Sequence, residues 1–302
     1  MTIMAVDPVL ARRAEIQQIA QATGQRRELL SRLALLACRS CLVVILIPLA
    51  ALLAYVVIRG ASAWSWAFFS HLPTPAGIPG GGIWNAIVGS FIIDGMAAAG
   101  AIPFGIAAGL FLAESSGRAA GVLRLAADVL SGVPSIVVAI FAYALLVAHG
   151  IHHFSALAAS FAIGILMLPV IMRASETAIR GVPSMLSEAG MALGARKATI
   201  ARKVVLPAAL PGLITGVLLA VARGAGETAP LLLTAVGSQY FSISPTQPIA
   251  AIPLVVYGNG IQAYPDLVKI AWGSALFLVV MILVLSVGSR LIAARLRRVR
   301  SD

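Results

Sequence analysis

Two charged residues, Arg223 and Glu227, lie inside the apolar run Leu210–Leu233, which is long enough to cross a lipid bilayer. A charged side chain in hydrocarbon is costly unless it is paired or faces a polar path. On a helix, side chains four residues apart share one face, so the two charges can neutralise each other. A guanidinium binds oxyanions in a fork geometry, and Thr228 adds a hydroxyl donor. The pattern indicates either a path for an anion or an ion pair that only fixes helix packing.

The composition places this pair in a membrane protein. The chain has 302 residues, of which 60% are hydrophobic and 11% charged, and its mean hydropathy is +0.98. These values are typical of a protein with several membrane spans. The net charge of +11 is also compatible with nucleic-acid binding. However, the basic residues are scattered between apolar runs and form no aromatic and basic surface module, which argues against a nucleic-acid partner.

Six apolar runs predict an all-α polytopic membrane protein with six transmembrane helices. These cover about residues 33–58, 84–112, 125–147, 155–172, 210–233 and 270–287. Residues 1–32 form a polar tail without the apolar region of a cleaved signal peptide, so the first span is expected to be an anchor. Pro103 and Pro134 predict kinks inside their spans. Four prolines in the loop 235–267 argue against a regular helix there.

The basic residues also predict the orientation. If both termini are cytoplasmic, the cytoplasmic pieces hold 19 of the 22 lysines and arginines. Those pieces are residues 1–39, 114–124, 173–205 and 290–302. An excess of basic residues in cytoplasmic segments is the usual pattern in membrane proteins, so both termini and the polar tail are expected in the cytoplasm.

The longest charged segment between spans, residues 173–207, is expected to hold a short amphipathic helix at the membrane surface. Pro183 suits the first turn of this helix and Gly194 suits its C-terminal stop. A second helical piece is expected at about Lys197–Leu206, ending at Pro207. Periodicity alone leaves open whether the first helix is an ordinary interfacial helix or a docking site for a partner.

Part of this segment resembles the cytoplasmic loop of ABC-importer permeases. The matching residues are Glu188, Ala189, Gly194, Leu206 and Pro207, with Gly190 where the family usually has a second alanine. In that family the loop is the coupling helix that docks in a groove on the cytosolic ATPase. The resemblance therefore implies that these residues couple the chain to an ATPase.

Four further segments are similar to the A-type permeases of phosphate ABC transporters. They are Gly80–Ser90, Asp128–Val137, Arg223–Leu231 and Ile249–Tyr257, in the order of that family. The resemblance covers about residues 70–295. It implies a type I importer permease core of five spans at about residues 84–293, with the first span packed outside it.

The resemblance also implies partners and a location. It implies a bacterial inner-membrane heterodimer with a C-type permease, two copies of a cytosolic ATPase and an extracytoplasmic phosphate-binding protein. The chain has no G-x-x-x-x-G-K-[ST] motif for nucleotide phosphates. ATP and Mg are therefore expected on the ATPase subunits, and no cofactor is expected on this chain.

With phosphate as the anion, the predicted pathway residues are Arg223, Glu227, Thr228 and Arg173. Glu227 is expected to make Arg223 tolerable in the membrane and to keep anion binding weak enough for release. Arg173 lies at the cytoplasmic end of the fourth span. It is either an anchor of the positive-inside kind or an inner contact for the anion.

Other charged residues are expected to pair locally. Arg124 and Asp128 are four residues apart and are expected to pair with each other. Glu176 and Arg180 are expected to extend from Arg173 as an exposed ladder of ion pairs, which contributes little stability.

No residue pattern predicts catalysis or a resident metal, so the chain is not expected to be an enzyme by itself. Cys38 and Cys41 form a C-x-x-C pair without a second pair, and small buried thiols are expected. Three histidines in one turn are a weak metal signal, and no metal site is expected there. They are His149, His152 and His153.

Two alternatives to a phosphate permease remain open from the residues. One is a permease for another oxyanion, sulfate or molybdate, and the other is a stand-alone secondary transporter. Asp94, inside the second span, has no counterpart expected in the family, and a carboxylate on the path would repel phosphate.

Overall fold

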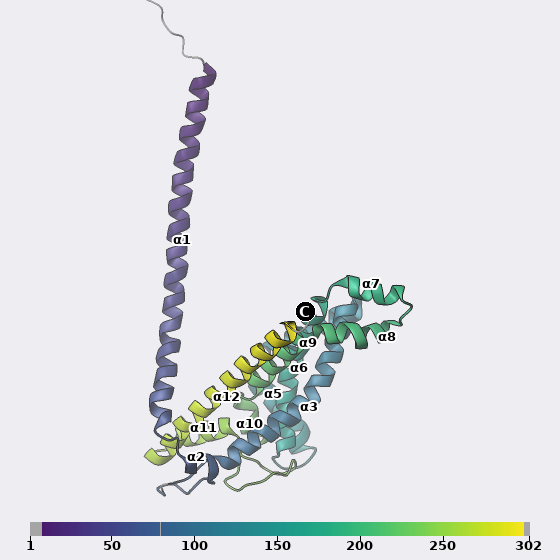
Figure 1. Ribbon diagram of the computed structural model, residues 1–302. Helices are drawn as coiled ribbons and strands as arrows, with labels where there is room; N and C mark the ends of the chain where they lie inside the picture. The colour runs from purple at the N-terminus through teal and green to yellow at the C-terminus, as the bar shows by residue number, and fades with distance from the viewer. Residues whose placement is uncertain (1–7, 79, 299–302) are drawn as a thin grey trace, which may run out of the picture. The chain divides into compact units, whose positions relative to one another are not determined.

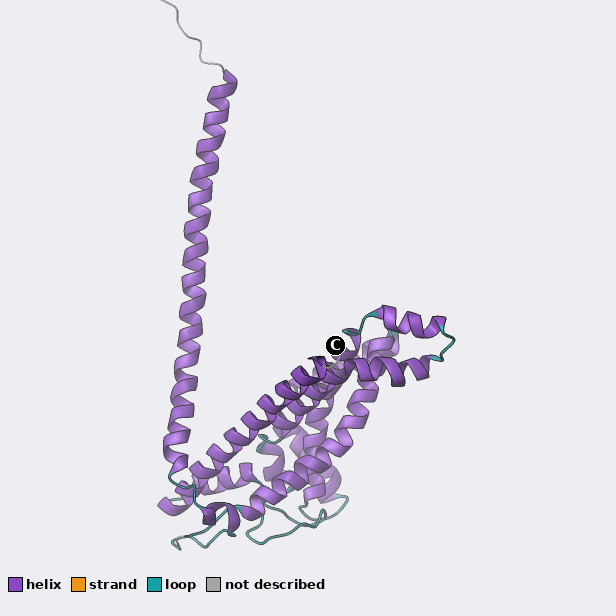
Figure 2. Ribbon diagram, in the orientation of Figure 1, coloured by secondary structure: helices purple, strands orange, loops and turns teal. Residues whose placement is uncertain are grey.

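The computed structural model describes residues 8–78 and 80–298. Within these residues every regular element is a helix, as the sequence predicts (Figure 2). The chain divides into two compact units, one ending at Val56 and one beginning at Val57.

The first unit is part of a single long helix, α1 (Pro8–Ala61), which runs on into the second unit. Its apolar part, Leu30–Ala61, is 32 residues long with a mean hydropathy of 3.0, which is sufficient to cross a membrane. Cys38 and Cys41 are free thiols on its exposed surface. The prediction of buried thiols is therefore wrong, because only 6% of the most apolar part of this helix is buried.

The second unit begins with the end of α1 and holds all remaining helices (Figure 1). In chain order the α-helices are α2 (Trp66–Ser70), α3 (Trp84–Glu114), α4 (Arg118–Gly132), α5 (Ser135–Ala142), α6 (Ala156–Arg180), α7 (Ser184–Ala192), α8 (Lys197–Ile200), α9 (Leu206–Gly224), α10 (Ala229–Thr234), α11 (Ile252–Gly260) and α12 (Pro265–Arg298). Two π-helical segments, η1 (Tyr143–Ala148) and η2 (Ala201–Val205), continue α5 and α8.

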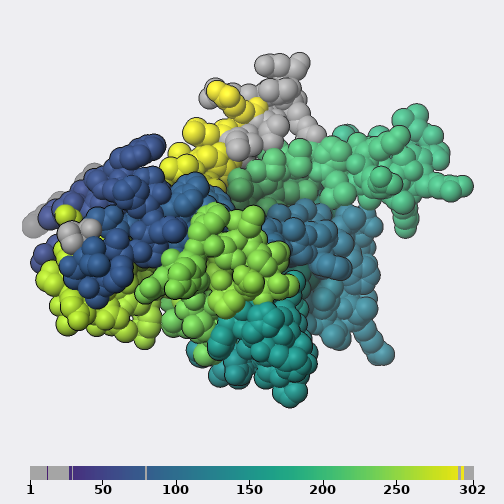
Figure 3. All heavy atoms as spheres, turned by 90° about the horizontal axis from the view of Figure 1, so that it is seen from below, coloured from purple at the N-terminus to yellow at the C-terminus, as the bar shows by residue number. Residues whose placement is uncertain are grey.

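The two ends of this unit differ in the elements they carry (Figure 1). α7 and α8 lie at one end, here called the α7 end, and α2 and α11 lie at the other, here called the α11 end. In the space-filling view of Figure 3, the green segment that holds α7 and α8 projects beyond the rest of the unit.

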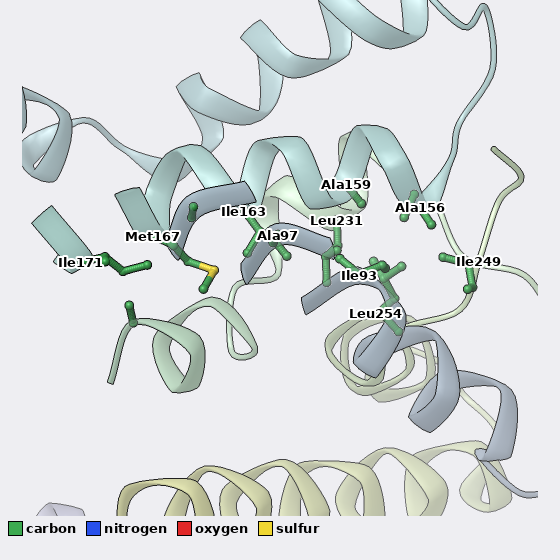
Figure 4. Packing of buried hydrophobic residues seen from close by; sticks show 14 residues of the cluster. Ile93, Ala97, Ala156, Ala159, Ile163, Met167, Ile171, Leu231, Ile249 and Leu254 are labelled. Carbon is green, nitrogen blue, oxygen red and sulfur yellow. The ribbon is translucent and has the colours of Figure 1, made fainter. Parts of the chain in front are cut away.

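α3 and α6 pack against each other along the centre of the unit, because glycines let their backbones approach closely. A Cβ at Gly105 would lie 2.6 Å from Cγ2 of Ile171, and one at Gly109 would collide with Cβ of Ser175. Small residues at such helix crossings are the usual way in which membrane helices associate. The main core cluster continues from this contact (Figure 4). It includes Ile93, Ala97, Ala156, Ala159, Ile163, Met167, Ile171, Leu231, Ile249 and Leu254.

The third predicted span is broken rather than kinked. α4 ends at Gly132, α5 begins at Ser135, and the two helices are bent by 101° at this break. Pro134 has no amide proton to donate and restricts the residue before it to an extended conformation. Val133 accordingly has φ −68° and ψ 130°. Pro103, in contrast, lies within the continuous helix α3.

Four other helices are long and apolar enough to cross a membrane. They are Trp84–Glu114, Ala156–Arg180, Lys197–Gly224 and Pro265–Leu291. With Leu30–Ala61 they make five candidate spans in the described residues, or six if the bent pair α4–α5 counts as one. The number agrees with the predicted fold class.

Two predictions about proline were wrong. The helix expected to stop at Pro207 continues through it, because Pro207 occupies the first turn of α9 and the π-helical segment η2 precedes it. The loop 235–267 contains the regular helix α11, whose first turn accepts Pro253 for the same reason. The helix continues through Pro207 and a new helix begins at Pro253, so proline ends a helix in neither place.

Candidate functional site

Arg223 and Glu227 lie at the end of a helix and not inside one. α9 ends at Gly224, and a short turn leads to α10 at Ala229. In that turn the amide of Gly226 donates to the carbonyl of Arg223 at 3.1 Å. The continuous helix predicted over 210–233 is therefore interrupted beside its charged residues, where the small residues of the Gly-Ala-Gly sequence permit a tight turn.

The two charges are only loosely paired. Arg223 Nε lies 3.9 Å from Glu227 Oε1, and the side chains are 61% and 20% exposed, respectively. A hydrogen bond between nitrogen and oxygen needs about 3.2 Å or less. The guanidinium therefore keeps its donors available for another partner, while the carboxylate partly balances its charge.

A cavity of about 240 Å³ lies next to this pair. Three segments that are far apart in the sequence form its wall: the break between α4 and α5, the middle of α6, and the end of α9. The lining residues are Leu130, Ser131, Val133, Pro134, Ser135, Leu166, Pro169, Val170, Arg223 and Glu227. The spacing along the chain predicts that Glu227 lies near Arg223, but it does not predict that the break at Pro134 lies near them too.

The proline break gives this cavity polar donors within an otherwise apolar wall. α5 begins at Ser135, and the first amides of a helix lack acceptors within the helix and carry its positive dipole end. The hydroxyls of Ser131 and Ser135 have no hydrogen-bond partner among the described residues. Helix amides, hydroxyls and a guanidinium around one small cavity form a site suited to an oxyanion.

Thr228 lies beside the pair but is not among the residues that line the cavity. It precedes the first residue of α10, and its carbonyl accepts the amide of Leu232 at 3.1 Å. Its predicted role as a donor in the pathway stays a prediction.

The second predicted arginine, Arg173, belongs to a network centred on Glu176. The carboxylate of Glu176 is 7% exposed and pairs with three guanidinium groups. Arg124 Nε lies 2.8 Å from Oε1, Arg173 Nη1 lies 3.1 Å from Oε2, and Arg180 Nη2 lies 3.2 Å from Oε1. Arg173 also pairs with Asp128 of α4, Nη2 to Oδ1, at 2.5 Å.

This network corrects two predictions. Arg124 and Asp128 do not pair with each other, because each finds a partner on α6: Glu176 for the arginine and Arg173 for the aspartate. The ladder on α6 does form, but its centre, Glu176, is buried and is not exposed. Tertiary packing of α4 on α6 decides the pairing, and spacing along one helix does not reveal it.

Two arginines of the network also bind the end of α3. Arg124 Nη2 donates to the carbonyls of Leu112 at 2.7 Å and Ser115 at 3.2 Å, and Arg180 Nη2 donates to that of Leu112 at 3.1 Å. Carbonyls at a helix C-terminus lack partners within the helix and carry its negative dipole end. The network therefore joins α3, α4 and α6 at the α7 end.

The predicted coupling residues divide into two groups. Glu188 and Ala189 are both exposed on α7, and Gly194 follows this helix with φ +77°, a conformation that glycine adopts without strain. Leu206 and Pro207 are half-buried in α9, and Leu206 packs against the cluster that contains Ile179, Val205 and Ala209.

The first group has exposed apolar neighbours. Met185 and Leu193, on and just after α7, are 74% and 88% exposed. Exposed apolar side chains of this size on a projecting helix are typical of a surface that binds another protein.

The remaining candidates carry no chemistry in the described residues. Asp94 is half-buried in α3 and has no ion-pair or hydrogen-bond partner there. The three histidines of the turn after η1 each contact a backbone carbonyl instead, those of Ala144, Ala148 and Thr246. No group of three possible metal ligands occurs among the described residues.

A larger cavity, of about 450 Å³, lies at the α11 end and is lined by neutral side chains. Among them is Asn85, whose Nδ2 donates to the carbonyl of Ser238 at 2.8 Å. Because the lining of this cavity includes no charged residue, the smaller cavity beside Arg223 is the better candidate for binding an anion.

Comparison with known proteins supports a transport role. Residues 101–300 match the family described as "Binding-protein-dependent transport system inner membrane component". The chain is 37% identical over 241 residues to the phosphate transport system permease protein PstA of Yersinia pestis, covering 79% of this chain and 81% of that protein. It is 36% identical over 267 residues to PstA 1 of Mycobacterium tuberculosis (strain H37Rv), covering 85% and 86%.

Two further similarities agree with this. The chain is 40% identical over 224 residues to PstA of Xylella fastidiosa (strain Temecula1), covering 74% of this chain and 78% of that protein. Among solved structures, a chain of the MetNI methionine ABC transporter in an inward-facing conformation superposes with a TM-score of 0.58. That match has 18% sequence identity and covers 71% of this chain and 97% of the other, so it supports the fold alone.

Proposed function

We propose that the cavity beside Arg223 is the phosphate contact of this chain, which belongs to the binding-protein-dependent transport system inner membrane components. Within that family it belongs to the phosphate transport system permease proteins, so it is a permease subunit of a phosphate importer. It is a multi-pass membrane protein with a transport role and not an enzyme by itself.

The observation that carries the proposal is the loose pairing of Arg223. Its guanidinium is 61% exposed and lies 3.9 Å from Glu227 on the wall of a cavity that also holds two serine hydroxyls and the first turn of α5. A site on a transport path must bind the anion and then release it. A guanidinium whose charge is partly balanced by a nearby carboxylate meets both needs. Thr228 is proposed as a further donor at the edge of this site.

Arg173 is proposed as a second contact on the same path. Val170 of α6 lines the cavity, and Arg173 follows it by about one helical turn toward the α7 end. If the α7 end is cytoplasmic, as the basic residues predict, an anion leaving the cavity next meets Arg173. The chain would thus form half of the translocation pathway, and a second permease of C type would form the other half.

The projecting residues of α7 are proposed as the contact with the ATPase. Glu188, Ala189 and Gly194 lie where the projecting segment can enter a groove on another protein, and Leu206 and Pro207 connect that segment to α9. In this proposal two ATPase subunits bind ATP and Mg, and an extracytoplasmic phosphate-binding protein delivers phosphate at the α11 end. Both termini would be cytoplasmic in the bacterial inner membrane.

The test is uptake of labelled phosphate by the reconstituted complex containing Arg223→Gln. Uptake is expected to fall at least about a hundredfold, since glutamine keeps a polar side chain but removes the charge and the fork of donors. Copurification of the second permease and the ATPase with the variant controls for assembly. Uptake near the wild-type rate by an assembled complex would contradict the proposed site.

Competition separates phosphate from the other anions. Excess unlabelled phosphate is expected to suppress uptake of the label, and sulfate or molybdate at the same concentration is not. A complex that accumulates phosphate without its ATPase would instead be a secondary transporter, and the proposed role of α7 would be wrong.

A further inference from the structure

The ion pair between Asp128 and Arg173 occupies a defined place relative to the cavity. Both helices that carry it also line the cavity: Leu130 and Ser131 of α4 follow Asp128 within three residues, and Val170 of α6 precedes Arg173 by three. Arg173 lies one helical turn from Val170 toward the α7 end. The pair therefore links the two walls of the cavity on the side that faces the α7 end.

The two carboxylates that hold Arg173 differ in how firmly they are fixed. Glu176 is 7% exposed and is also bound by Arg124 and Arg180. If its carboxylate moved away, three guanidinium groups would lose the counter-charge that they share, so it is held firmly. Asp128 is 57% exposed, and Arg173 is its only ion-pair partner among the described residues. Of the two partners of Arg173, Asp128 is the one that can be exchanged.

The contact with Asp128 uses the edge of the guanidinium that an oxyanion would use. Nε and Nη2 of Arg173 both donate to Oδ1 of Asp128, at 3.1 and 2.5 Å, while Nη1 donates to Glu176. Guanidinium groups bind carboxylate and phosphate oxygens through the same donors. Asp128 and an anion therefore compete for one edge of Arg173, while Glu176 holds the other edge in place.

From these observations we propose that the Asp128–Arg173 pair is the inner gate of the cavity: it closes the α7 side at rest, and it opens when Asp128 gives up Arg173. This inference deepens the proposed function, on which it rests, by assigning a role to a carboxylate outside the cavity. Glu176 is the positioning residue that keeps Arg173 directed at Asp128. The anion leaves past Arg173 after the carboxylate has withdrawn.

Accessibility of a thiol introduced in the cavity tests this gate. Ser131 lines the cavity and is replaced conservatively by Ser131→Cys, in a chain whose two native cysteines are changed by Cys38→Ser and Cys41→Ser. The complete transporter is kept in inside-out membrane vesicles without ATP. The rates at which two membrane-impermeant thiol reagents, one negatively and one positively charged, modify the introduced thiol then report access from the side expected to be cytoplasmic, because an open gate raises both rates.

Asp128→Asn is expected to raise the modification rate at least about tenfold, because the amide keeps the size of the side chain but not the ion pair. Asp128→Glu keeps the carboxylate and is expected to return the rate to within about threefold of the parent. The matched control is Glu28→Gln, which removes one carboxylate from an exposed ion pair with Arg32 in α1 and is expected to leave the rate unchanged.

A modification rate that is the same in the parent and in the Asp128→Asn variant would overturn the gate. If Ser131→Cys does not assemble, Ser135→Cys on the other side of the proline break reports on the same cavity. The readout needs no transport, so it is independent of the phosphate uptake that tests the proposed function. A complex without phosphate uptake but with a modification rate that depends on Asp128 would retain the gate and lose the proposed substrate.

Discussion

Arg223 and Arg173 are chemically identical, and each is followed within four residues by a glutamate, yet their surroundings give them different properties. Arg223 has one carboxylate at 3.9 Å and a cavity beside it. Arg173 has two carboxylates, at 2.5 and 3.1 Å, one of them buried among three arginines. The difference shows that the number and burial of partners, more than the spacing along the chain, decides whether an arginine is available to a ligand or fixed in the structure.

The largest effect is expected where the network is broken at its centre. Glu176→Ala removes a buried carboxylate that three guanidinium groups share, and the loss should destabilise the protein by about 3–5 kcal/mol. Thermal unfolding of the purified complex in detergent measures it. Glu227→Ala, the same substitution in the loose pair, is the comparison, and equal shifts in Tm for the two variants would contradict the contrast between the sites.

Arg223→Lys is expected to reduce phosphate uptake but to leave the stability of the protein nearly unchanged. Lysine keeps the positive charge but loses the planar fork that binds two oxygens at once. Uptake of labelled phosphate should fall about tenfold while Tm stays within about 2 °C, because the parent side chain makes no close ion pair. A large drop in Tm with normal uptake per folded complex would instead assign Arg223 a packing role.

A modest change is expected for Glu227→Gln. Removing the partial counter-charge strengthens anion binding at Arg223, so the phosphate concentration at half-maximal uptake and the maximal rate should both fall about two- to fivefold, the change that corresponds to about 0.5–1 kcal/mol. Kinetics of uptake over a range of phosphate concentrations give both values. An increase in the half-saturating concentration would mean that Glu227 assists binding.

The smallest effect is expected at Glu28, whose carboxylate lies 2.7 Å from Arg32 Nη2 with both side chains exposed. Exposed pairs four residues apart on a helix contribute about 0.5 kcal/mol or less. Glu28→Gln should therefore change neither Tm nor uptake measurably. This pair has a shorter N–O distance than any of the pairs that Glu176 makes, so an unchanged Tm here beside a large drop in Tm for Glu176→Ala would show that burial, and not distance, sets the stability.

The sequence predicted what depends on long apolar runs and on local chemistry. The five continuous candidate spans of the described residues, the helix that begins after Pro183, and the glycine stop at Gly194 each follow from composition or from a capping rule within a few residues. Arg223 and Glu227 were also selected as candidate pathway residues, because charges in an apolar run stand out.

What the sequence did not predict depends on contacts between helices. The partners of Arg124 and Asp128 lie far along the chain on α6, and no spacing rule along one helix finds them. The break at Pro134 was expected only as a kink, so the two serines beside it were not expected in a cavity wall. Pro207 and Pro253 were taken as helix breakers, although a proline in the first turn of a helix is well tolerated.

The helix that passes through Pro207 has a mechanical consequence. Lys197–Gly224 is one uninterrupted rod of 28 residues, or about 42 Å at about 1.5 Å per residue, with α7 packed beside its first turn and Arg223 in its last. A displacement of α7 would therefore be transmitted along this helix to the end that carries Arg223. The π-helical segment η2 lies near the α7 end of this helix, and a change of winding there would turn the Arg223 guanidinium relative to the cavity.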